Sequence, residues 1–146
     1  MVPMSSDENA GHEALRVPDG QLDYDEELIY WFCGEKFTGI GYEEISGRGV
    51  SEVSYRDGLQ DGPARDWYPS GALKGESIYQ KNLLHGHVRE FRENGGLISD
   101  KEYEHGILVR SAEYDASGEM TSSSTLAEGS PNYSRLQRLR EHFSSD

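Results

Sequence analysis

Cysteine is almost absent from this sequence. Cys33 is the only one, so no disulfide can form within the chain, and we expect a cytoplasmic protein in a reducing compartment. Long apolar runs are also missing, and none approaches the ~20 residues needed to span a bilayer. Residues 1–20 have neither an apolar stretch nor a basic leader, so we expect no signal peptide.

Basic residues are scarce relative to acidic ones. The chain has 14 Lys and Arg against 27 Asp and Glu, which gives a formal net charge of −13. A field of this sign repels nucleic acid and anionic lipid and attracts basic surfaces. We therefore expect neither a nucleic acid nor a membrane as partner. The alternative is that the charge serves solubility alone.

Patterns that would indicate catalysis or metal binding are lacking as well. His85 and His87 lie two residues apart without a third ligand nearby, which argues against a metal site. No Ser/His/Asp or Cys/His set has usable spacing, and no pair of carboxylates is marked as acid and base. We expect no enzyme, no catalytic residue and no cofactor. Cys33 is expected to be a small buried hydrophobic residue.

Glycine and tyrosine are abundant, with 17 and 9 copies, and many of them recur at a fixed interval. Tyr55, Tyr79 and Tyr103 are evenly spaced and mark the start of three successive units. Matches at the same offset fall on glycine, aromatic and leucine positions, which indicates an internal structural repeat. They are Leu59 and Leu83, Gly62 and Gly86, Trp67 and Phe91, Gly71 and Gly95, and Leu73 and Leu97.

Each unit has the alternation of two β-strands. The segments "PSG", "ENGG" and "DASG" have hairpin-turn chemistry, and "RDGLQDG" and "KNLLHG" are expected to form longer turns at the opposite end. The third unit is one residue shorter, which we attribute to a shorter hairpin loop. The sequence therefore predicts a mainly β protein, an antiparallel meander of hairpins.

The chain divides into three parts. We expect residues 1–14 to be a disordered leader, 15–126 a single repeat domain, and 127–146 a linker with an amphipathic C-terminal helix. The helix is predicted from a start signal at Ser130–Asn132 and an apolar stripe that packs on the end of the sheet. The alternative is a frayed surface tail. The stripe consists of Tyr133, Leu136, Leu139 and Phe143.

The repeat resembles a known one. The pattern Tyr-x-x-Gly-x-x-x-Gly-x-x-x-x-Trp/Phe-x-x-x-Gly-x-Leu runs through Tyr55–Leu73 and recurs in Tyr79–Leu97 with Asn82 in place of the first glycine. It resembles the MORN-repeat variant, and residues 20–140 resemble the YwqK-type antitoxin family. The resemblance implies MORN-like β-hairpin repeats. It also implies an immunity protein that neutralises a toxin, such as a nuclease or deaminase, by binding it. Arg110, like Asn82, replaces an expected glycine, so its turn is expected to differ.

An acidic surface is the candidate interface with such a toxin, whose own surface would be basic. If alternation holds, the sheet face opposite Trp67 and Phe91 carries acidic groups around aromatic anchors. The alternatives are a solvated sheet face without a partner and a non-catalytic MORN-repeat scaffold or membrane-tethering module. The candidate residues are Asp66, Tyr68, Glu76, Glu90, Arg92 and Glu102 on this face and Asp57, Asp61 and Glu93 in adjacent turns.

Overall fold

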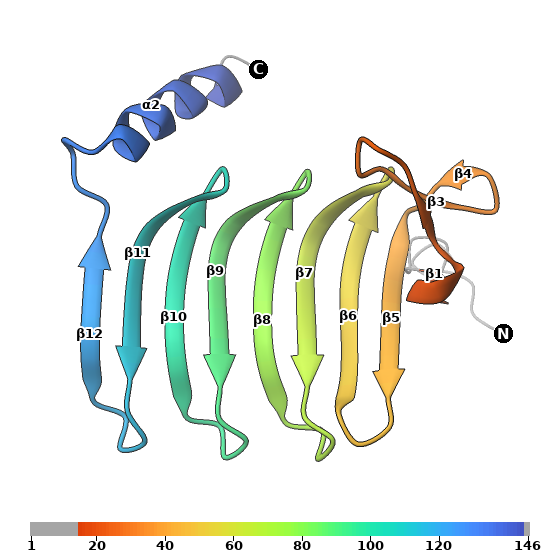
Figure 1. The fold of residues 1–146 in the computed structure, drawn as a ribbon, viewed down its shortest axis with the longest axis horizontal. Helices are drawn as coiled ribbons and strands as arrows, with labels where there is room; N and C mark the ends of the chain where they lie inside the picture. Colours follow the sequence, from red (N-terminus) through yellow and green to blue (C-terminus); the bar gives the residue numbers. More distant parts are fainter. Residues whose placement is uncertain (1–14, 145–146) are drawn as a thin grey trace, which may run out of the picture.

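The computed structural model describes residues 15–144, and the predicted leader 1–14 lies outside that range. The fold is mainly β, a long antiparallel meander followed by one short C-terminal helix (Figure 1). In chain order the elements are β1 (Leu15–Pro18), η1 (Asp19–Gln21), β2 (Asp23–Tyr24), β3 (Tyr30–Phe32), β4 (Glu35–Lys36), β5 (Gly39–Ile45), β6 (Gly49–Arg56), β7 (Leu59–Trp67), β8 (Leu73–Gln80), β9 (Leu83–Phe91), β10 (Leu97–Glu104), β11 (Ile107–Tyr114), β12 (Met120–Thr125) and α2 (Pro131–Ser144).

Nine strands form one sheet, in the order β1-β5-β6-β7-β8-β9-β10-β11-β12. From β5 onward each strand pairs antiparallel with the next one, as the alternation in the sequence predicts. The exception is β1, which runs parallel to β5 at the edge and was not predicted. A second small sheet, β2-β3-β4, lies beside that edge (Figure 1).

The turns at the end of the sheet nearest α2 are tight rather than long, so that prediction was wrong. Each consists of two residues with positive φ, the conformation that a type I′ hairpin turn requires. Asn82 takes the glycine position of its turn with φ 72°, a conformation that asparagine tolerates. The three turns are Asp57–Gly58, Lys81–Asn82 and His105–Gly106.

The missing residue of the third unit is lost from a strand irregularity. In β7 and β9 the pairing slips by two residues around Gly62 and Gly86, whose φ values are 102° and 128°. In β11 the pairing slips by only one residue. Arg110 and His87 both pair with Glu102, from its two sides, so Arg110 takes the place of His87 and not that of the glycine. The third unit therefore lacks the glycine itself, and its turn keeps its length, contrary to the expected shorter loop.

Successive turns at this end are bonded to one another. A side chain in one unit accepts a hydrogen bond from the first N–H of the next unit's turn, which satisfies a backbone donor that would otherwise need water. The N–H of Asp57 donates to Thr38 at 2.9 Å, that of Lys81 to Asp61 at 3.1 Å, and that of His105 to His85 at 3.0 Å.

The largest buried cluster lies where the N-terminal segment covers β5 and β6. Val17, Phe37 and Tyr55 form it, and the rings of Phe37 and Tyr55 lie 5.5 Å apart. Burial raises the pKa of the Tyr55 hydroxyl well above its usual value. Cys33 does not join this cluster: it is exposed in a turn with φ 52°, so its predicted burial was wrong.

The C-terminal helix α2 packs against the end of the sheet, as predicted. Ser130 caps its start, with the hydroxyl accepting the N–H of Tyr133 at 3.2 Å. Leu136 is 1% exposed. Arg140 donates to both carboxylate oxygens of Glu104, at 2.6 and 2.8 Å. Within residues 15–144, no helix is long and apolar enough to cross a membrane.

Candidate binding surface

The two faces of the large sheet differ in how their charges are paired. Residues directly opposite one another on neighbouring strands share a face, and residues alternate between faces along each strand. We call the face that carries Tyr55, Tyr79 and Tyr103 the tyrosine face. The face that carries Arg65 and Arg89 is the arginine face.

On the arginine face, acidic and basic residues alternate across five consecutive strands. The ladder runs Glu52, Arg65, Glu76, Arg89 and Asp100, each directly opposite the next. Arg65 Nε lies 2.7 Å from Glu76, and Arg89 Nε lies 3.3 Å from Asp100. The repeat creates this ladder, because Glu52, Glu76 and Asp100 occupy the same position in successive units, as do the two arginines.

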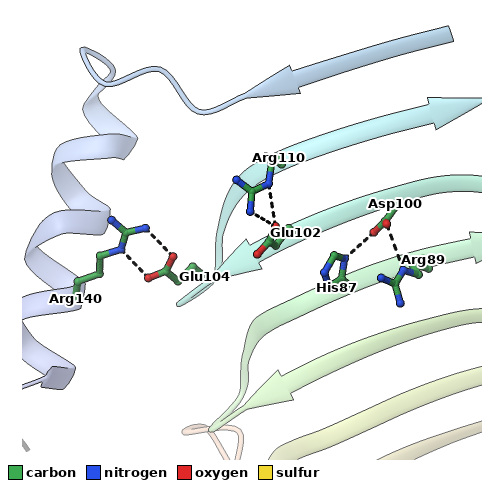
Figure 2. Close-up of polar contacts among 7 residues, drawn as sticks. All are labelled: His87, Arg89, Asp100, Glu102, Glu104, Arg110 and Arg140. Atoms are coloured by element: carbon green, nitrogen blue, oxygen red, sulfur yellow. Dashed lines mark hydrogen bonds and ion pairs between the residues drawn. The ribbon is translucent and has the colours of Figure 1, made fainter. Parts of the chain in front are cut away.

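Further pairs extend this neutralisation toward both ends of the sheet. His87 Nδ1 lies 2.8 Å from Asp100, and Arg110 bonds to Glu102 (Figure 2). At the other edge, Arg16 Nε lies 2.9 Å from Glu52. Burial acts to raise the pKa of Asp100, but hydrogen bonds from His87 and Arg89 lower it overall. The arginine face therefore presents little uncompensated charge.

On the tyrosine face, four carboxylates form one row across alternate strands. Serine or glycine separates them, and neighbouring carboxylates are two strand spacings apart, about 9.5 Å. All four are exposed, and none forms an ion pair with a described Lys or Arg. We call this the acidic row. Its order is Glu43, Ser51, Asp66, Gly75, Glu90, Ser99, Glu113 and Ser122.

The contacts of the acidic row leave its charge in place. Serine hydroxyls donate to it, from Ser51 to Asp66 at 2.6 Å and from Ser99 to Glu90 at 3.1 Å. Lys101 lies in the neighbouring register row of this face, and Arg48 and Lys74 line a hollow with Glu43 and Asp66 without forming an ion pair with them. Serine is neutral, so these bonds orient the carboxylates without cancelling their field. Asp19 also feels this field: burial, and then the charge of Glu43, raise its pKa.

Only part of the predicted interface lies on this face. Asp66 and Glu90 belong to the acidic row, but Glu76 and Glu102 lie on the arginine face, so the prediction that these residues share one face was wrong. The reason is a bulge in which Lys74 has no partner between the pairs of Asp66 and Trp67. One extra residue reverses the facing of everything after it along the strand.

The predicted turn residues fall at opposite ends of the sheet. Asp57 and Asp61 lie at the end nearest α2, whereas Glu93 lies in the turn between β9 and β10 (Figure 1). Asp61 accepts the N–H of Lys81 and lies 3.5 Å from Arg56 Nε. Its carboxylate therefore holds a turn in place, and the structure does not bring Asp57, Asp61 and Glu93 together.

Tyr68 and Arg92 also have structural contacts. The Tyr68 hydroxyl donates to the Phe91 carbonyl at 2.7 Å, and Arg92 Nη2 donates to the Tyr114 carbonyl at 3.0 Å. Both side chains reach the end of a strand in the next unit. They support the sheet that presents the acidic row, and neither is a free anchor for a partner.

Sequence reasoning missed Glu43 and Glu113 as members of the row. The signal was present but offset by one position. The interval from Glu43 to Asp66, like that from Glu90 to Glu113, is one residue shorter than the interval from Tyr55 to Tyr79. A search at a fixed repeat interval therefore does not align Glu43 with Asp66 or Glu113 with Glu90. The loss of the glycine from β11 accounts for the second offset.

The described residues contain no group of three or more His, Cys, Asp or Glu arranged to hold a metal ion. Comparison of the chain with protein-family models, with curated proteins and with solved structures gives no match. The geometry of the two sheet faces is therefore the basis on which a function can be argued.

Proposed function

We propose that the protein is an immunity protein or antitoxin that binds a cognate toxin of the nuclease or deaminase type and inhibits it. The observation that carries the proposal is the acidic row. Its four carboxylates are exposed and form no ion pair with described cations, while most charges of the arginine face are paired with one another. A repeat that pairs its charges on one side and leaves them unpaired on the other favours a cationic partner on the second side.

Nucleases and nucleic-acid deaminases bind a polyanion, so their substrate sites carry Lys and Arg. The acidic row offers a line of negative charge in place of that substrate. Between the carboxylates lie Ser51, Gly75 and Ser99, whose small side chains allow a partner's basic groups to approach closely. Inhibition follows from occupying the toxin's site, and the mechanism requires no cofactor and no catalytic residue in this chain.

The resemblance of the repeat to the MORN-repeat variant and to YwqK-type antitoxins supports the same proposal. The net charge of −13 supports it as well, because a partner of opposite charge is attracted over distances of about a Debye length. Both are consistent with a binder that acts in the compartment where it is made, for which we propose the cytoplasm.

The proposal is tested by isolating the proteins that bind this chain from its source cells and, for a bound nuclease or deaminase, measuring the association rate at several salt concentrations. We expect tight binding whose association rate falls steeply as salt rises, and lower rates for Asp66→Asn with Glu90→Gln. The control is Glu26→Gln with Glu27→Gln, which removes the same charge from an exposed N-terminal turn.

Two results would contradict the proposal. One is an association rate that does not depend on salt, or that drops equally in the two double variants. The other is cosedimentation of the protein with anionic vesicles at physiological salt, which would favour a membrane-tethering module instead.

A further inference from the structure

The arginine face is hollowed at the end of the sheet away from α2. A hollow of about 450 Å³ lies between the β5–β6 hairpin and the turn that joins β7 to β8. We call it the tryptophan hollow. Aromatic and aliphatic side chains line it together with two carboxylates, and the residues that matter for its chemistry are Glu44, Val50, Glu52, Trp67, Tyr68 and Pro69.

The two carboxylates of the tryptophan hollow differ in their contacts. Glu52 is already bonded to Arg16 at 2.9 Å. Glu44 is exposed, and among residues 15–144 it forms no ion pair. Glu44 thus adds one uncompensated negative charge to a hollow that Trp67 also lines, in the same register row and two strands away. An aromatic face and a free carboxylate are the two elements that recognise a flat cation.

The chain itself contains a filled version of this arrangement next to the hollow. The guanidinium carbon of Arg16 lies 3.9 Å from the ring centroid of Tyr42, and its Nε bonds to Glu52. Tyr42 and Glu44 are two residues apart on β5 and therefore share the arginine face. Two residues further along β5, in the next register row of this face, the hollow again combines a ring with a carboxylate, and within residues 15–144 no arginine forms an ion pair with Glu44.

We propose that the tryptophan hollow binds an arginine side chain of a partner protein. The guanidinium stacks on Trp67, and its N–H groups donate to Glu44. Arginine fits better than lysine because its planar, weakly hydrated guanidinium stacks on aromatic rings and bonds to a carboxylate through two N–H groups. The aliphatic part of the side chain packs against Val50 and Pro69.

The cation contacts recorded for the two rings favour Trp67 over Tyr68 as the stacking ring. A second hollow also borders Trp67, and its lining includes Glu43, Arg48, Asp66 and Lys74. Lys74 Nζ lies 5.7 Å from the ring centroid of Tyr68, so a cation of the chain already approaches that ring. Within residues 15–144 no cation is recorded over the ring of Trp67, so Trp67 is the more available of the two surfaces.

This site is separate from the acidic row, because it lies on the arginine face and uses Glu44 instead of the row's carboxylates. It applies to a partner's arginine whether or not that partner is a toxin. Failure of either proposal therefore leaves the other intact.

The test is a titration of the full chain with N-acetyl-arginine amide, followed by the NMR signals of the two tryptophan indoles. We expect saturable shifts for Trp67 and for Gly47 and Gly71 in the lining. Trp31 should not respond, because its indole N–H donates to Asp25 at 3.0 Å away from the hollow. N-acetyl-citrulline amide, a neutral probe of the same shape, should bind about tenfold more weakly.

Two variants with the same loss of charge separate the site from the general field of the protein. Glu44→Gln should weaken the arginine probe about tenfold, and Glu128→Gln, in the segment between β12 and α2, should leave it unchanged. Both positions are exposed, so both variants should fold. Equal binding of arginine and citrulline, an unchanged affinity in Glu44→Gln, or shifts confined to the acidic row would each overturn the inference.

Discussion

The hydroxyl of Tyr68 donates a hydrogen bond of 2.7 Å to the backbone carbonyl of Phe91, at the end of β9. One unit later, Arg92 Nη2 donates to the carbonyl of Tyr114 at the end of β11. Tyr68 and Arg92 occupy the same position in their successive units. Two different side chains therefore make the same link, which joins each unit to the next at the end of the sheet away from α2.

Tyr68→Phe removes the donor and keeps the ring. We expect the free energy of unfolding to fall by about 1 kcal/mol, since the Phe91 carbonyl loses its partner in a partly buried place. Urea denaturation measures the change, and Tyr24→Phe, at a tyrosine that is 66% exposed, is the control. Equal stability of Tyr68→Phe and the wild type would show that water replaces the bond without cost.

Gly49 starts β6 at a point where no side chain fits. Its φ is 103°, and a Cβ there would lie 1.9 Å from the Trp67 carbonyl oxygen. Gly49→Ala should lower the stability by more than ~2 kcal/mol, because both the backbone conformation and the contact with β7 must change. Gly47→Ala is the matched control. Gly47 has φ 80° and nothing within 4 Å, so only the ~1 kcal/mol conformational cost remains.

Thermal unfolding of the two glycine variants separates the two causes. If Gly47→Ala lost as much stability as Gly49→Ala, positive φ alone would explain both, and close packing of β6 against Trp67 would play no part. The comparison also bears on the tryptophan hollow, because Gly47 and Gly49 both line it.

The meander could be predicted from the sequence because its signals are local. The repeat period, the turn segments and the apolar stripe of α2 each depend on neighbouring residues, and the strands and the helix follow from them. The parallel strand β1 could not be predicted in this way. Its pairing of Leu15 with Gly39 joins segments with no shared pattern, and nothing in residues 15–18 distinguishes a parallel edge strand from an antiparallel one.

The candidate surface was harder to predict because facing depends on bulges. Alternation counted from Trp67 places Glu76 beside Asp66, but the extra residue Lys74 moves Glu76 opposite Arg65. The irregularity between Leu97 and Ser99 likewise moves Glu102 to the arginine face, opposite His87. A bulge adds one residue without a clear sequence signal. Composition therefore identified an acidic protein, and only the register of the strands identified which face carries the unpaired charge.

The arginine-face ladder should contribute little to stability, although its geometry is regular. Arg65 is 43% exposed in its side chain, and exposed ion pairs are worth roughly 0.2–1 kcal/mol. Arg65→Met should therefore cost about 0.5 kcal/mol at low salt and less at high salt, as measured by urea denaturation. Lys81→Met, an exposed turn residue, is the control. A loss several times larger than that of a single exposed pair would mean that the ladder acts as a cooperative network.

The packing of α2 should depend on pH through His105. Its ring stacks on Phe143 at 4.4 Å and lies 4.7 Å from the ring of His85, whose Nδ1 accepts the backbone N–H of His105. Burial, and then the charge of His85, lower the pKa of His105; Glu104 acts in the opposite direction, and Arg140 again lowers it. His85, His105 and Phe143 line one hollow between the turns and α2, and Lys81 lines it as well.

The pKa of His105 is lower in the folded state than in the unfolded state. As the pH falls below the ordinary histidine pKa of 6.5, the unfolded state therefore binds more protons than the folded state. Stability from neutral His105 is thus complete above about pH 6.5 and is lost as the pH falls through the folded pKa. His105→Asn removes this titration and suits the turn's φ of 50°. The free energy of unfolding, measured by urea denaturation from pH 8 to 5, should fall more in the wild type than in His105→Asn. Parallel curves would mean that His105 titrates alike in both states and that α2 does not sense its charge.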